Sequence, residues 1–209
     1  MVNSIRQCRP YFELLSKSIQ ALPFDDVDRV ANLLVRAHEQ ERSIFLFGNG
    51  GSAALASHFA CDLGKGTVNG SKKRFRVLAL TDNVPLMTAW ANDAKYEDIF
   101  AEQLANFVRP HDIAFAISGS GNSPNVLRAL RTAKNTGATT VGLAGFAGGK
   151  MRALCDECIV VPCDNMQIIE DLHLCVAHSL FTCVRAKLAE ERTKHVALGP
   201  RLLPRTGTR

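Results

Sequence analysis

A strand that opens through glycines into a helix constrains the fold of this chain more than any other feature. The stretch from Ser43 to Leu63 reads SIFLFGNGGSAALASHFACDL and predicts a buried strand at Ile44 to Phe47, followed by a loop and a helix. The loop consists of Gly48, Asn49, Gly50, Gly51 and Ser52. Small residues at such a junction leave backbone N–H groups pointing outward at the positive end of the helix dipole. The stretch therefore predicts a binding loop for an anion such as a phosphate.

The helix after this loop carries two groups that can exchange protons or bind a metal ion. His58 and Asp62 are four residues apart, which places both side chains on one face of the helix. We expect this pair and the preceding loop to belong to one site.

A second loop of the same kind follows the strand predicted at Ile113 to Ile117. It consists of Ser118, Gly119, Ser120, Gly121, Asn122 and Ser123, and Pro124 then favours the first turn of a helix. Three hydroxyl groups and free amide groups within one turn suit a phosphate monoester. A dinucleotide site is disfavoured because the first loop lacks the third glycine of the G-x-G-x-x-G pattern. A tight polar turn without a ligand stays open as the alternative.

The order of the predicted elements indicates the fold class. Further strands are predicted at 76–80, 139–143 and 158–161, and further helices on both sides of residues 92–93, at about 125–135, after residue 148 and at about 168–190. Strands that alternate with helices predict an α/β protein, a three-layer αβα sandwich with a mainly parallel five-stranded sheet. Ligands of such sheets bind beyond the carboxyl ends of the strands, where both glycine-containing loops lie.

Two amphipathic helices, predicted at 4–22 and about 26–39, precede the first strand. They cannot be crossover connections between strands, so we expect this N-terminal extension of about 1–40 to pack on the outside of the sheet or on another subunit. We interpret the extension as an oligomerisation element.

Composition indicates the class of protein and its compartment. The length of 209 residues predicts one domain, 1–190, followed by a basic, flexible tail, 191–209. Of the formal charge of +5, the last 23 residues carry +4, so the body of the chain lacks the basic stripe of a nucleic-acid binder. No apolar run approaches the roughly 20 residues that cross a bilayer, and the first residues lack the order of a signal peptide. We therefore expect a cytoplasmic protein that binds neither nucleic acid nor membrane.

Seven scattered cysteines, an odd number, suit reduced thiols better than a disulfide framework. Cys155, Cys158 and Cys163 form a C-x-x-C pair with a later thiol, but a structural zinc ion normally has four ligands. We expect these three cysteines to be packing residues.

The last predicted helix carries polar groups in an otherwise apolar pattern. Glu170 and His178 lie two turns apart and within about 80° of each other around the helix, with His173 between them. A helical histidine is commonly a core residue, yet two histidines beside acidic residues on a packed helix also suit a site. The sequence leaves both interpretations open.

Four separated motifs, GNGGSA…SHFA, SGSGNSPNV, WANDAKYEDIF and IEDLHL…H, together resemble the phosphoheptose isomerases of the SIS (sugar isomerase) domain family. The similarity covers nearly all of residues 1–188 and follows the family's order of motifs. The resemblance implies a flavodoxin-like SIS fold, a homotetramer with sites between subunits, and conversion of sedoheptulose 7-phosphate to D-glycero-D-manno-heptose 7-phosphate, commonly with zinc.

The resemblance also implies roles for individual residues. Asn49 and Ser52 match the substrate-binding loop, Ser118, Ser120 and Ser123 match the phosphate-binding serines, and Asp93 matches a residue that contacts sugar hydroxyls. His58 matches a metal ligand, and His178 matches a histidine that serves as metal ligand and acid/base. The chain departs from the pattern at Asp62, where the family has glutamate, at Glu170, where it has glutamine, and at Gly119, where it has threonine. The family's arginine after the first histidine helix has no counterpart, Lys65 being the nearest basic residue.

These observations predict an aldose-ketose isomerase that acts on a sugar phosphate through an enediol, with Asp62 as base and His178 as acid. The predicted substrate-binding residues are Asn49, Gly50, Gly51, Ser52, Asp93, Ser118, Gly119, Ser120, Ser123 and Glu170. The predicted ligands of one Zn²⁺ per site are His58, Asp62, Glu170 and His178, since two imidazoles and two carboxylates suit zinc. Two alternatives stay open: a non-catalytic SIS module that binds a phosphosugar or a protein, and an isomerase for a different sugar phosphate.

Overall fold

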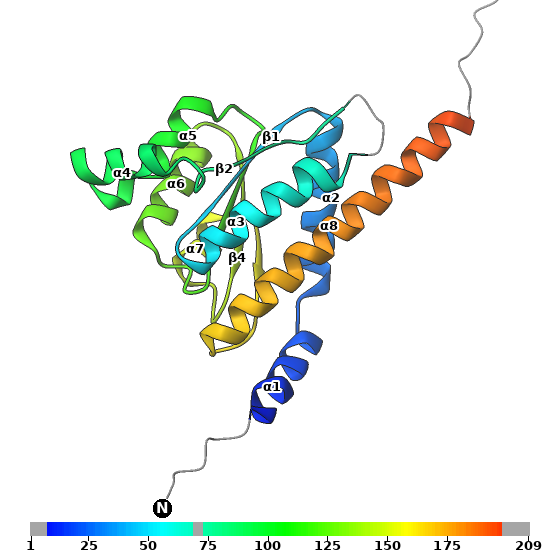
Figure 1. Cartoon of the computed structure of the whole chain (residues 1–209), viewed down its shortest axis with the longest axis horizontal. Helices are drawn as coiled ribbons and strands as arrows, with labels where there is room; N and C mark the ends of the chain where they lie inside the picture. The colour runs from blue at the N-terminus through cyan, green and yellow to red at the C-terminus, as the bar shows by residue number, and fades with distance from the viewer. Residues whose placement is uncertain (1–7, 69–72, 198–209) are drawn as a thin grey trace, which may run out of the picture.

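Five parallel strands form the centre of the molecule (Figure 1). The computed structural model describes residues 8–68 and 73–197. The strands are β1 (Ser43–Gly48), β2 (Arg76–Ala79), β3 (Ile113–Ser118), β4 (Thr139–Ala144) and β5 (Glu157–Val160), in the order β2-β1-β3-β4-β5. Every neighbouring pair of strands is parallel. The structure thus confirms the predicted α/β class and the five-stranded parallel sheet.

Alternating residues of the strands supply two separate cores. In β1, Ile44 and Leu46 pack into the core on one face of the sheet, whereas Phe45 and Phe47 pack into the core on the other face. All four side chains are almost fully buried. A strand that is apolar on both faces is typical of a sheet covered on both sides by helices.

The helices form the two outer layers (Figure 1). The first layer contains α2 (Phe24–Glu39), α3 (Gly51–Cys61) and the long α8 (Met166–Ala197), and its apolar residues join Ile44 and Leu46. The second contains α5 (Ala101–Phe107), α6 (Pro124–Asn135) and α7 (Gly149–Leu154), which pack with Phe45 and Phe47. Between β2 and α5 lie α4 (Val84–Asp93) and a short 3₁₀ helix, η2 (Tyr96–Asp98).

The two N-terminal helices behave differently from each other. Helix α2 packs on the outside of the sheet, as predicted, with Val30 and Leu34 fully buried in the first core. Helix α1 (Arg9–Gln20) extends away from the sheet toward the N-terminus (Figure 1), and of its residues only Ser18 is buried. Phe12, at 64% exposure, and Ile19 remain accessible. The role of this extension in oligomerisation stays a prediction.

Several element ends differ from the sequence prediction. The last strand begins at Glu157 rather than Cys158, because its pairing with β4 starts at Val141 and Glu157. Helix α8 begins at Met166, where the side-chain oxygen of Asn165 accepts the Ile168 N–H at 3.2 Å, and it continues to residue 197 through the first part of the predicted tail. Predictions for residues 4–7 and 198–209 lie outside the described residues.

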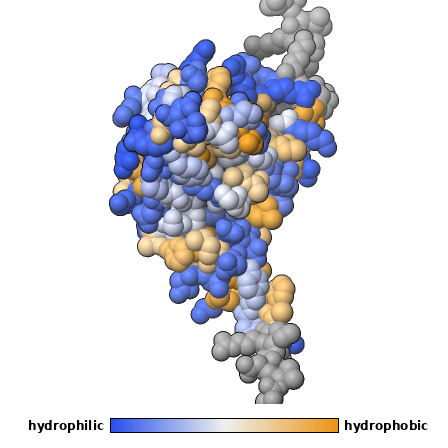
Figure 2. Space-filling model, turned by 60° about the vertical axis from the view of Figure 1, so that its left-hand side comes forward, coloured by the Kyte–Doolittle hydropathy of each residue, from blue (hydrophilic) through white to orange (hydrophobic). Residues whose placement is uncertain are grey.

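The exposed surface is mixed, with apolar patches among polar side chains (Figure 2). Within the described ranges, no helix combines the length and apolar character required to cross a membrane. All seven cysteines are free thiols. The Sγ atoms of Cys155 and Cys158 would each lie 3.0 Å from a Cβ atom on Gly142, so both pack against β4 as the sequence suggests.

Candidate active site

The two glycine-containing loops meet at the carboxyl edge of the sheet. Strands β1 and β3 are neighbours, with Gly48 in register with Ile117, so the loops after them start side by side. The Asn49 amide donates from Nδ2 to Asn125 Oδ1 at 2.9 Å, and Asn125 Nδ2 donates to Asn49 Oδ1 at 2.8 Å. The fold therefore joins the first predicted anion-binding loop to α6, the helix that follows the second loop.

The start of α8 joins these loops because glycines leave room for it. A Cβ atom on Gly119 would lie 2.5 Å from the sulfur of Met166, and one on Gly51 would lie 3.1 Å from Oε2 of Glu170. A Cβ on Gly48 would lie 2.6 Å from the Ile117 carbonyl oxygen. Contacts under 3.0 Å require the neighbouring atoms to move, so larger residues would push the loops and α8 apart.

The serine loop after β3 presents its polar groups in a compact turn. Ser118 Oγ lies 3.4 Å from Ser123 Oγ, and Ser120 Oγ accepts the Asn122 N–H at 3.2 Å. Gly121 adopts φ +62°, and a Cβ there would lie 2.1 Å from the Gly148 carbonyl oxygen, so only glycine fits. The Ser123 side chain makes no capping bond to α6, which leaves its hydroxyl available to a ligand at the helix N-terminus.

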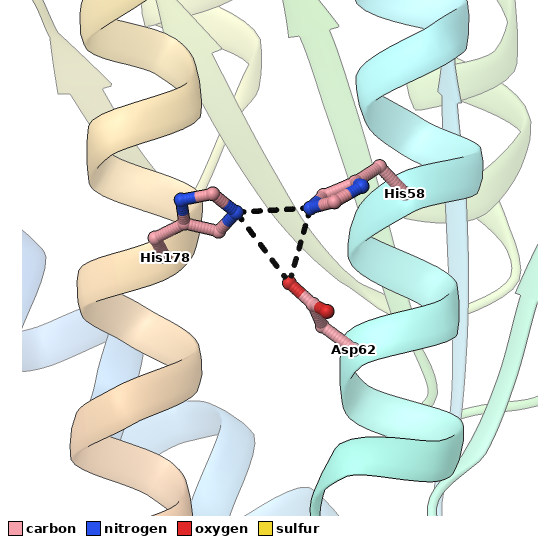
Figure 3. Close-up of side chains that lie close together, drawn as sticks. All are labelled: His58, Asp62 and His178. Carbon is pink, nitrogen blue, oxygen red and sulfur yellow. Dashed lines mark hydrogen bonds and ion pairs between the residues drawn. The ribbon is translucent and has the colours of Figure 1, made fainter.

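Two histidines and an aspartate face one another across α3 and α8 (Figure 3). His58 Nε2 lies 2.9 Å from His178 Nε2. Asp62 Oδ2 lies 3.4 Å from His58 Nε2 and 3.8 Å from His178 Nε2. The imidazoles are half exposed, and the carboxylate is more buried, at 23% exposure. The predicted acid/base pair, Asp62 and His178, is thus brought together from positions 116 residues apart in the chain.

Local distortion of the first helix places Asp62. Helix α3 ends at Cys61, and the chain continues as a π-helical turn, η1 (Asp62–Gly66). Such turns are rare and occur frequently at functional sites. A Cβ atom on Gly66 would lie 2.6 Å from the ring of Phe181, so the glycine allows α8 to approach this turn closely. The turn and the close helix crossing together set the distance between His58 and His178.

The three facing side chains fit a metal ion by donor type and by spacing. Their ligand atoms all lie within 4.8 Å of one another. A tetrahedral zinc ion with bonds of about 2.0 Å holds its ligand atoms roughly 3.3 Å apart. The separations of 2.9, 3.4 and 3.8 Å lie around that value. Without an ion, the two Nε2 atoms at 2.9 Å require one imidazole to donate and the other to accept.

Two of the predicted site residues lie apart from the three facing side chains. The Glu170 carboxylate lies against Gly51 and outside the cluster of His58, Asp62 and His178. The Asp93 side chain is exposed at the end of α4, where it accepts a hydrogen bond from Asn92 at 2.8 Å. The roles of Glu170 as a metal ligand and of Asp93 as a substrate contact stay predictions.

A cavity of about 330 Å³ lies between the start of α3 and the start of α8. Its wall is formed by Gly51, Ser52, Ala54, Leu55, His58, Glu170, Asp171, His173 and Leu174. His173 is 1% exposed. Burial lowers the pKa of His173 to about 4, so its imidazole is neutral at pH 7. The neutral ring of His173 thus lines the cavity, with a backbone hydrogen bond at Ala144 that raises its pKa against the larger effect of burial.

Asn125 and Tyr96 were missed by the sequence prediction. Asn125 is 1% exposed and pairs with Asn49, and the Tyr96 hydroxyl donates to Asn49 Oδ1 at 3.0 Å. Both residues lie inside the motifs that carry the family resemblance, but neither has a reactive side chain. Asn49 and Asn125 are 76 positions apart, and a local sequence pattern cannot indicate that two such distant amides pair.

The class of protein follows from the family model that this chain matches. Residues 11–145 match the model of the SIS domain. They include the sheet strands β1 to β4 and both glycine-containing loops. Together with the parallel sheet and its loop-bound site, this match defines a SIS-domain protein.

Individual relatives give the particular family. The phosphoheptose isomerase of Helicobacter pylori (strain P12) is 37% identical over 179 residues, which cover 86% of this chain and 92% of the relative. That of Paramagnetospirillum magneticum is 42% identical over 146 residues, 70% of this chain and 76% of the relative. The solved phosphoheptose isomerase of Neisseria gonorrhoeae superposes with a TM-score of 0.79 at 27% identity, covering 85% of this chain and 96% of the other. The chain belongs to the phosphoheptose isomerase family of SIS-domain proteins.

Proposed function

We propose that this chain interconverts sedoheptulose 7-phosphate and D-glycero-D-manno-heptose 7-phosphate. The observation that carries the proposal is the cluster of Asp62, His58 and His178, in which His58 shares a cavity with Gly51 and Ser52 of the first loop, in a chain of the phosphoheptose isomerase family. An aldose-ketose isomerase needs a base and an acid near adjacent carbons and a fixed phosphate at the far end of the sugar. The geometry supplies groups for each of these roles.

In this mechanism the phosphate is bound by hydroxyl and amide donors at the loop after β3, from Ser118, Ser120 and Ser123, with Ser52 from the first loop. Asp62 takes a proton from C1 of the ketose while His178 gives a proton to the oxygen on C2. The resulting enediol accepts the proton from Asp62 at C2, and the oxygen on C1 returns a proton to His178. The aldose is then formed, and both side chains have regained their starting protonation states.

We further propose a Zn²⁺ ion held by His58, Asp62 and His178, with Glu170 as a further ligand. Two imidazoles and a carboxylate at these separations suit zinc, which fits the donor set. When bound, such an ion supplies a Lewis acid next to the oxygens of the reacting carbons. Elemental analysis of the purified protein checks the ion, and activity that survives exhaustive chelation would contradict its role.

We also propose a cytoplasmic homotetramer with sites between subunits. Exposed apolar side chains on α1 and α4, such as Phe12 and Val84, support contacts with other copies. Seven free thiols support a reducing compartment. Light scattering at several protein concentrations measures the assembly state.

Incubation with sedoheptulose 7-phosphate in D₂O, with and without added Zn²⁺, tests the isomerase proposal. Deuterium uptake at C1 or C2 followed by NMR, together with an aldose product, is the expected result. Ligand-induced shifts without exchange would instead favour a non-catalytic binding module. Absence of any interaction would favour a different sugar phosphate, because Asp62, Glu170 and Gly119 differ from the family pattern.

A further inference from the structure

The orientation of the Asn125 side chain is fixed by its own backbone neighbour. The Val126 N–H donates to Asn125 Oδ1 at 2.9 Å. Because a backbone amide can only donate, this contact identifies which side-chain atom is oxygen. The Nδ2 group of Asn125 therefore points to Asn49, where it donates to Oδ1 at 2.8 Å.

Asn49 is oriented in turn by this fixed neighbour. Its Nδ2 donates back to Asn125 Oδ1 at 2.9 Å, so the two amides form a reciprocal pair. Rotating the Asn49 amide by 180° would place oxygen against oxygen and nitrogen against nitrogen. Two hydrogen bonds would be replaced by two repulsive contacts, at a site where Asn125 is 1% exposed and water cannot compensate.

The Tyr96 hydroxyl fills the second acceptor position of the Asn49 side-chain oxygen. It donates to Asn49 Oδ1 at 3.0 Å, so both acceptor positions of this oxygen are occupied, by Tyr96 and by Asn125. The Nδ2 group has two hydrogens, and Asn125 uses one of them. Asn49 itself is only partly buried, at the mouth of the first loop. One N–H group of Asn49 is left for a ligand.

We infer that Asn125 is a positioning residue that fixes Asn49 as a hydrogen-bond donor to an oxygen of the bound sugar phosphate, with Tyr96 blocking the acceptor side. The inference rests on the proposed function, because it takes the ligand at the first loop to be a sugar phosphate. The facing ligand atom must be an acceptor, such as a hydroxyl, carbonyl or phosphate oxygen. A protonated amine at that place would meet a donor and be rejected.

The variant Asn125→Asp tests this inference through pH. A protonated carboxyl group presents one acceptor and one O–H donor and so reproduces the pattern of the amide, whereas the ionised form only accepts. Burial disfavours the ionised form of the introduced carboxyl group, whereas the Val126 N–H and the N-terminus of α6 favour it, so both forms are sampled by varying pH. The variant's KM for sedoheptulose 7-phosphate should match the wild-type value at the acidic end of the activity range and rise roughly tenfold above it as the carboxyl ionises. The turnover number should change less than KM.

Matched variants separate orientation from packing. Asn125→Leu has a similar size and neither hydrogen bond, so its KM should be raised about tenfold at every pH. Tyr96→Phe keeps the ring and frees one lone pair of Asn49, and we expect a rise in KM of only about threefold. Thermal melting of each variant across the same pH range reports the fold.

The outcomes are distinct. A KM of Asn125→Leu that equals the wild-type value at every pH overturns the inference, as does a rise that coincides with loss of folded protein. If wild type binds sedoheptulose 7-phosphate without isomerising it, the proposed function fails alone, and the same pH comparison is made on dissociation constants from calorimetry. A pH-dependent loss of affinity in Asn125→Asp alone still supports the inference in that case.

Discussion

The two ends of the sheet both carry polar side chains, but they differ in how these side chains are paired. At the amino end, Asp112 precedes β3 and accepts the backbone N–H groups of Ser43 at 2.8 Å and Arg109 at 2.9 Å. Asp156 precedes β5 in the same way and accepts the N–H and the hydroxyl of Thr140, each at 2.8 Å. Each aspartate ties the start of its own strand to a neighbouring segment.

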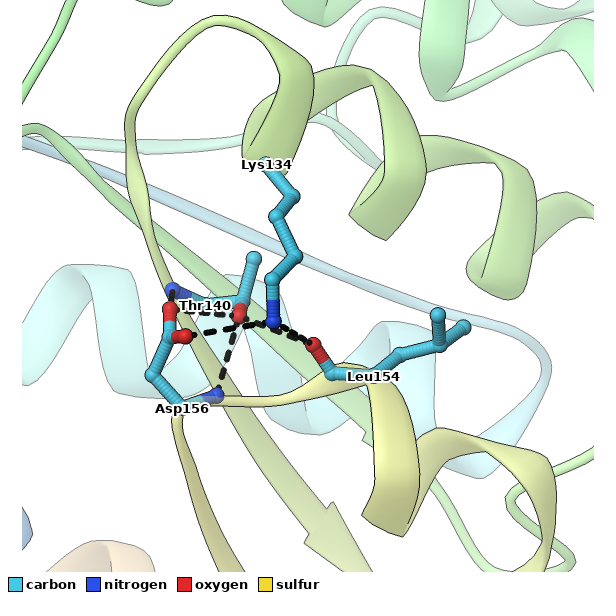
Figure 4. A network of polar contacts seen from close by, with 4 residues as sticks. All are labelled: Lys134, Thr140, Leu154 and Asp156. Atoms are coloured by element: carbon cyan, nitrogen blue, oxygen red, sulfur yellow. Dashed lines mark hydrogen bonds and ion pairs between the residues drawn. The ribbon is translucent and has the colours of Figure 1, made fainter.

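The polar contacts around Asp156 show how the groups at the amino end pair with one another (Figure 4). Lys134 Nζ donates to the Leu154 carbonyl at 3.0 Å and lies 3.3 Å from Asp156 Oδ1. Burial works to raise the pKa of Asp156, but the hydrogen bonds from Thr140 and the charge of Lys134 outweigh it and lower that pKa. Such a network holds strands in place and leaves little capacity for a ligand.

The carboxyl end has the same kinds of group with unused capacity. The hydroxyl of Ser123 makes no capping bond, and one N–H of Asn49 is available. Unpaired polar groups in a buried place cost free energy, so their retention indicates a ligand that pairs with them. Both ends contain polar groups, but the site is the end where some of these groups have no hydrogen-bond partner within the protein.

The largest expected effect comes from the charge of Asp62, in the cluster with His58 and His178. Asp62→Asn removes the proposed base and should lower kcat by roughly 10²- to 10⁴-fold, while binding of the sugar phosphate persists. Kinetics together with calorimetric binding of sedoheptulose 7-phosphate measure both quantities. Asp62→Glu is the matched control, because it keeps the carboxylate and should retain most of the turnover. Unchanged kcat in Asp62→Asn would remove this residue from the chemistry.

At the amino end of the sheet, Asp112→Ala should lower the free energy of unfolding and leave catalysis intact. Asp112 is 4% exposed, and its removal leaves the N–H groups of Ser43 and Arg109 without their acceptor. An unpaired buried donor costs about 1 to 3 kcal/mol, and because these two N–H groups are only part-buried, the free energy of unfolding should fall by about 2 kcal/mol in urea titrations. A loss of kcat in the folded variant would show that the two ends are not independent.

The position of the two loops at the carboxyl end of the sheet could be predicted from the sequence. The glycine-containing loops after two apolar strands located the carboxyl edge, because parallel strands end on the same side. The spacing of His58 and Asp62 placed both on one helix face, and the structure confirms that they lie together. His178 was assigned to them only through the family resemblance, since helical spacing gives no information about which helices cross.

The rest depended on long-range packing. The close approach of Phe181 to Gly66 and the π turn at Asp62 set how α8 crosses α3, and no periodicity in the sequence specifies that crossing. Glu170, predicted beside the histidines, consequently lies against Gly51. The pairing of Asn49 with Asn125 joins two loops through side-chain amides, whose partners depend on strand order rather than on neighbouring residues.

His173, in the wall of the cavity, should make the free energy of unfolding depend on pH. Its pKa is about 4 in the folded protein because of burial, below the ordinary value of 6.5. Between these values the unfolded chain binds a proton that the folded protein does not, so the free energy of unfolding falls as pH is lowered from 6.5 to 4. The full loss attributable to this residue is about 3 kcal/mol.

Urea titrations at pH 7 and pH 4.5 measure that loss. His38, whose pKa is also lowered by burial, contributes in the same direction, so the comparison is made with His173→Phe, which keeps a ring without a titrating group. The variant should be less sensitive to acid than wild type by about 2 kcal/mol at pH 4.5. Equal sensitivity of the two proteins would mean that the ring of His173 gains a partner and is protonated in the fold.

The smallest effect is expected from Thr140→Val in the network around Asp156. The substitution removes the hydroxyl contact with Asp156 but keeps the two backbone bonds, Thr140 N–H to the carboxylate and Asp156 N–H to the Thr140 carbonyl. The free energy of unfolding should fall by about 1 kcal/mol, with kcat and KM unchanged, and Thr140→Ser should restore most of the loss. Because the hydroxyl helps to lower the pKa of Asp156, the difference between wild type and Thr140→Val should shrink as pH falls and that carboxylate is protonated. A difference that instead persists in acid would show that the hydroxyl acts through its bonds to the Leu154 carbonyl and the Asp156 N–H rather than through the carboxylate.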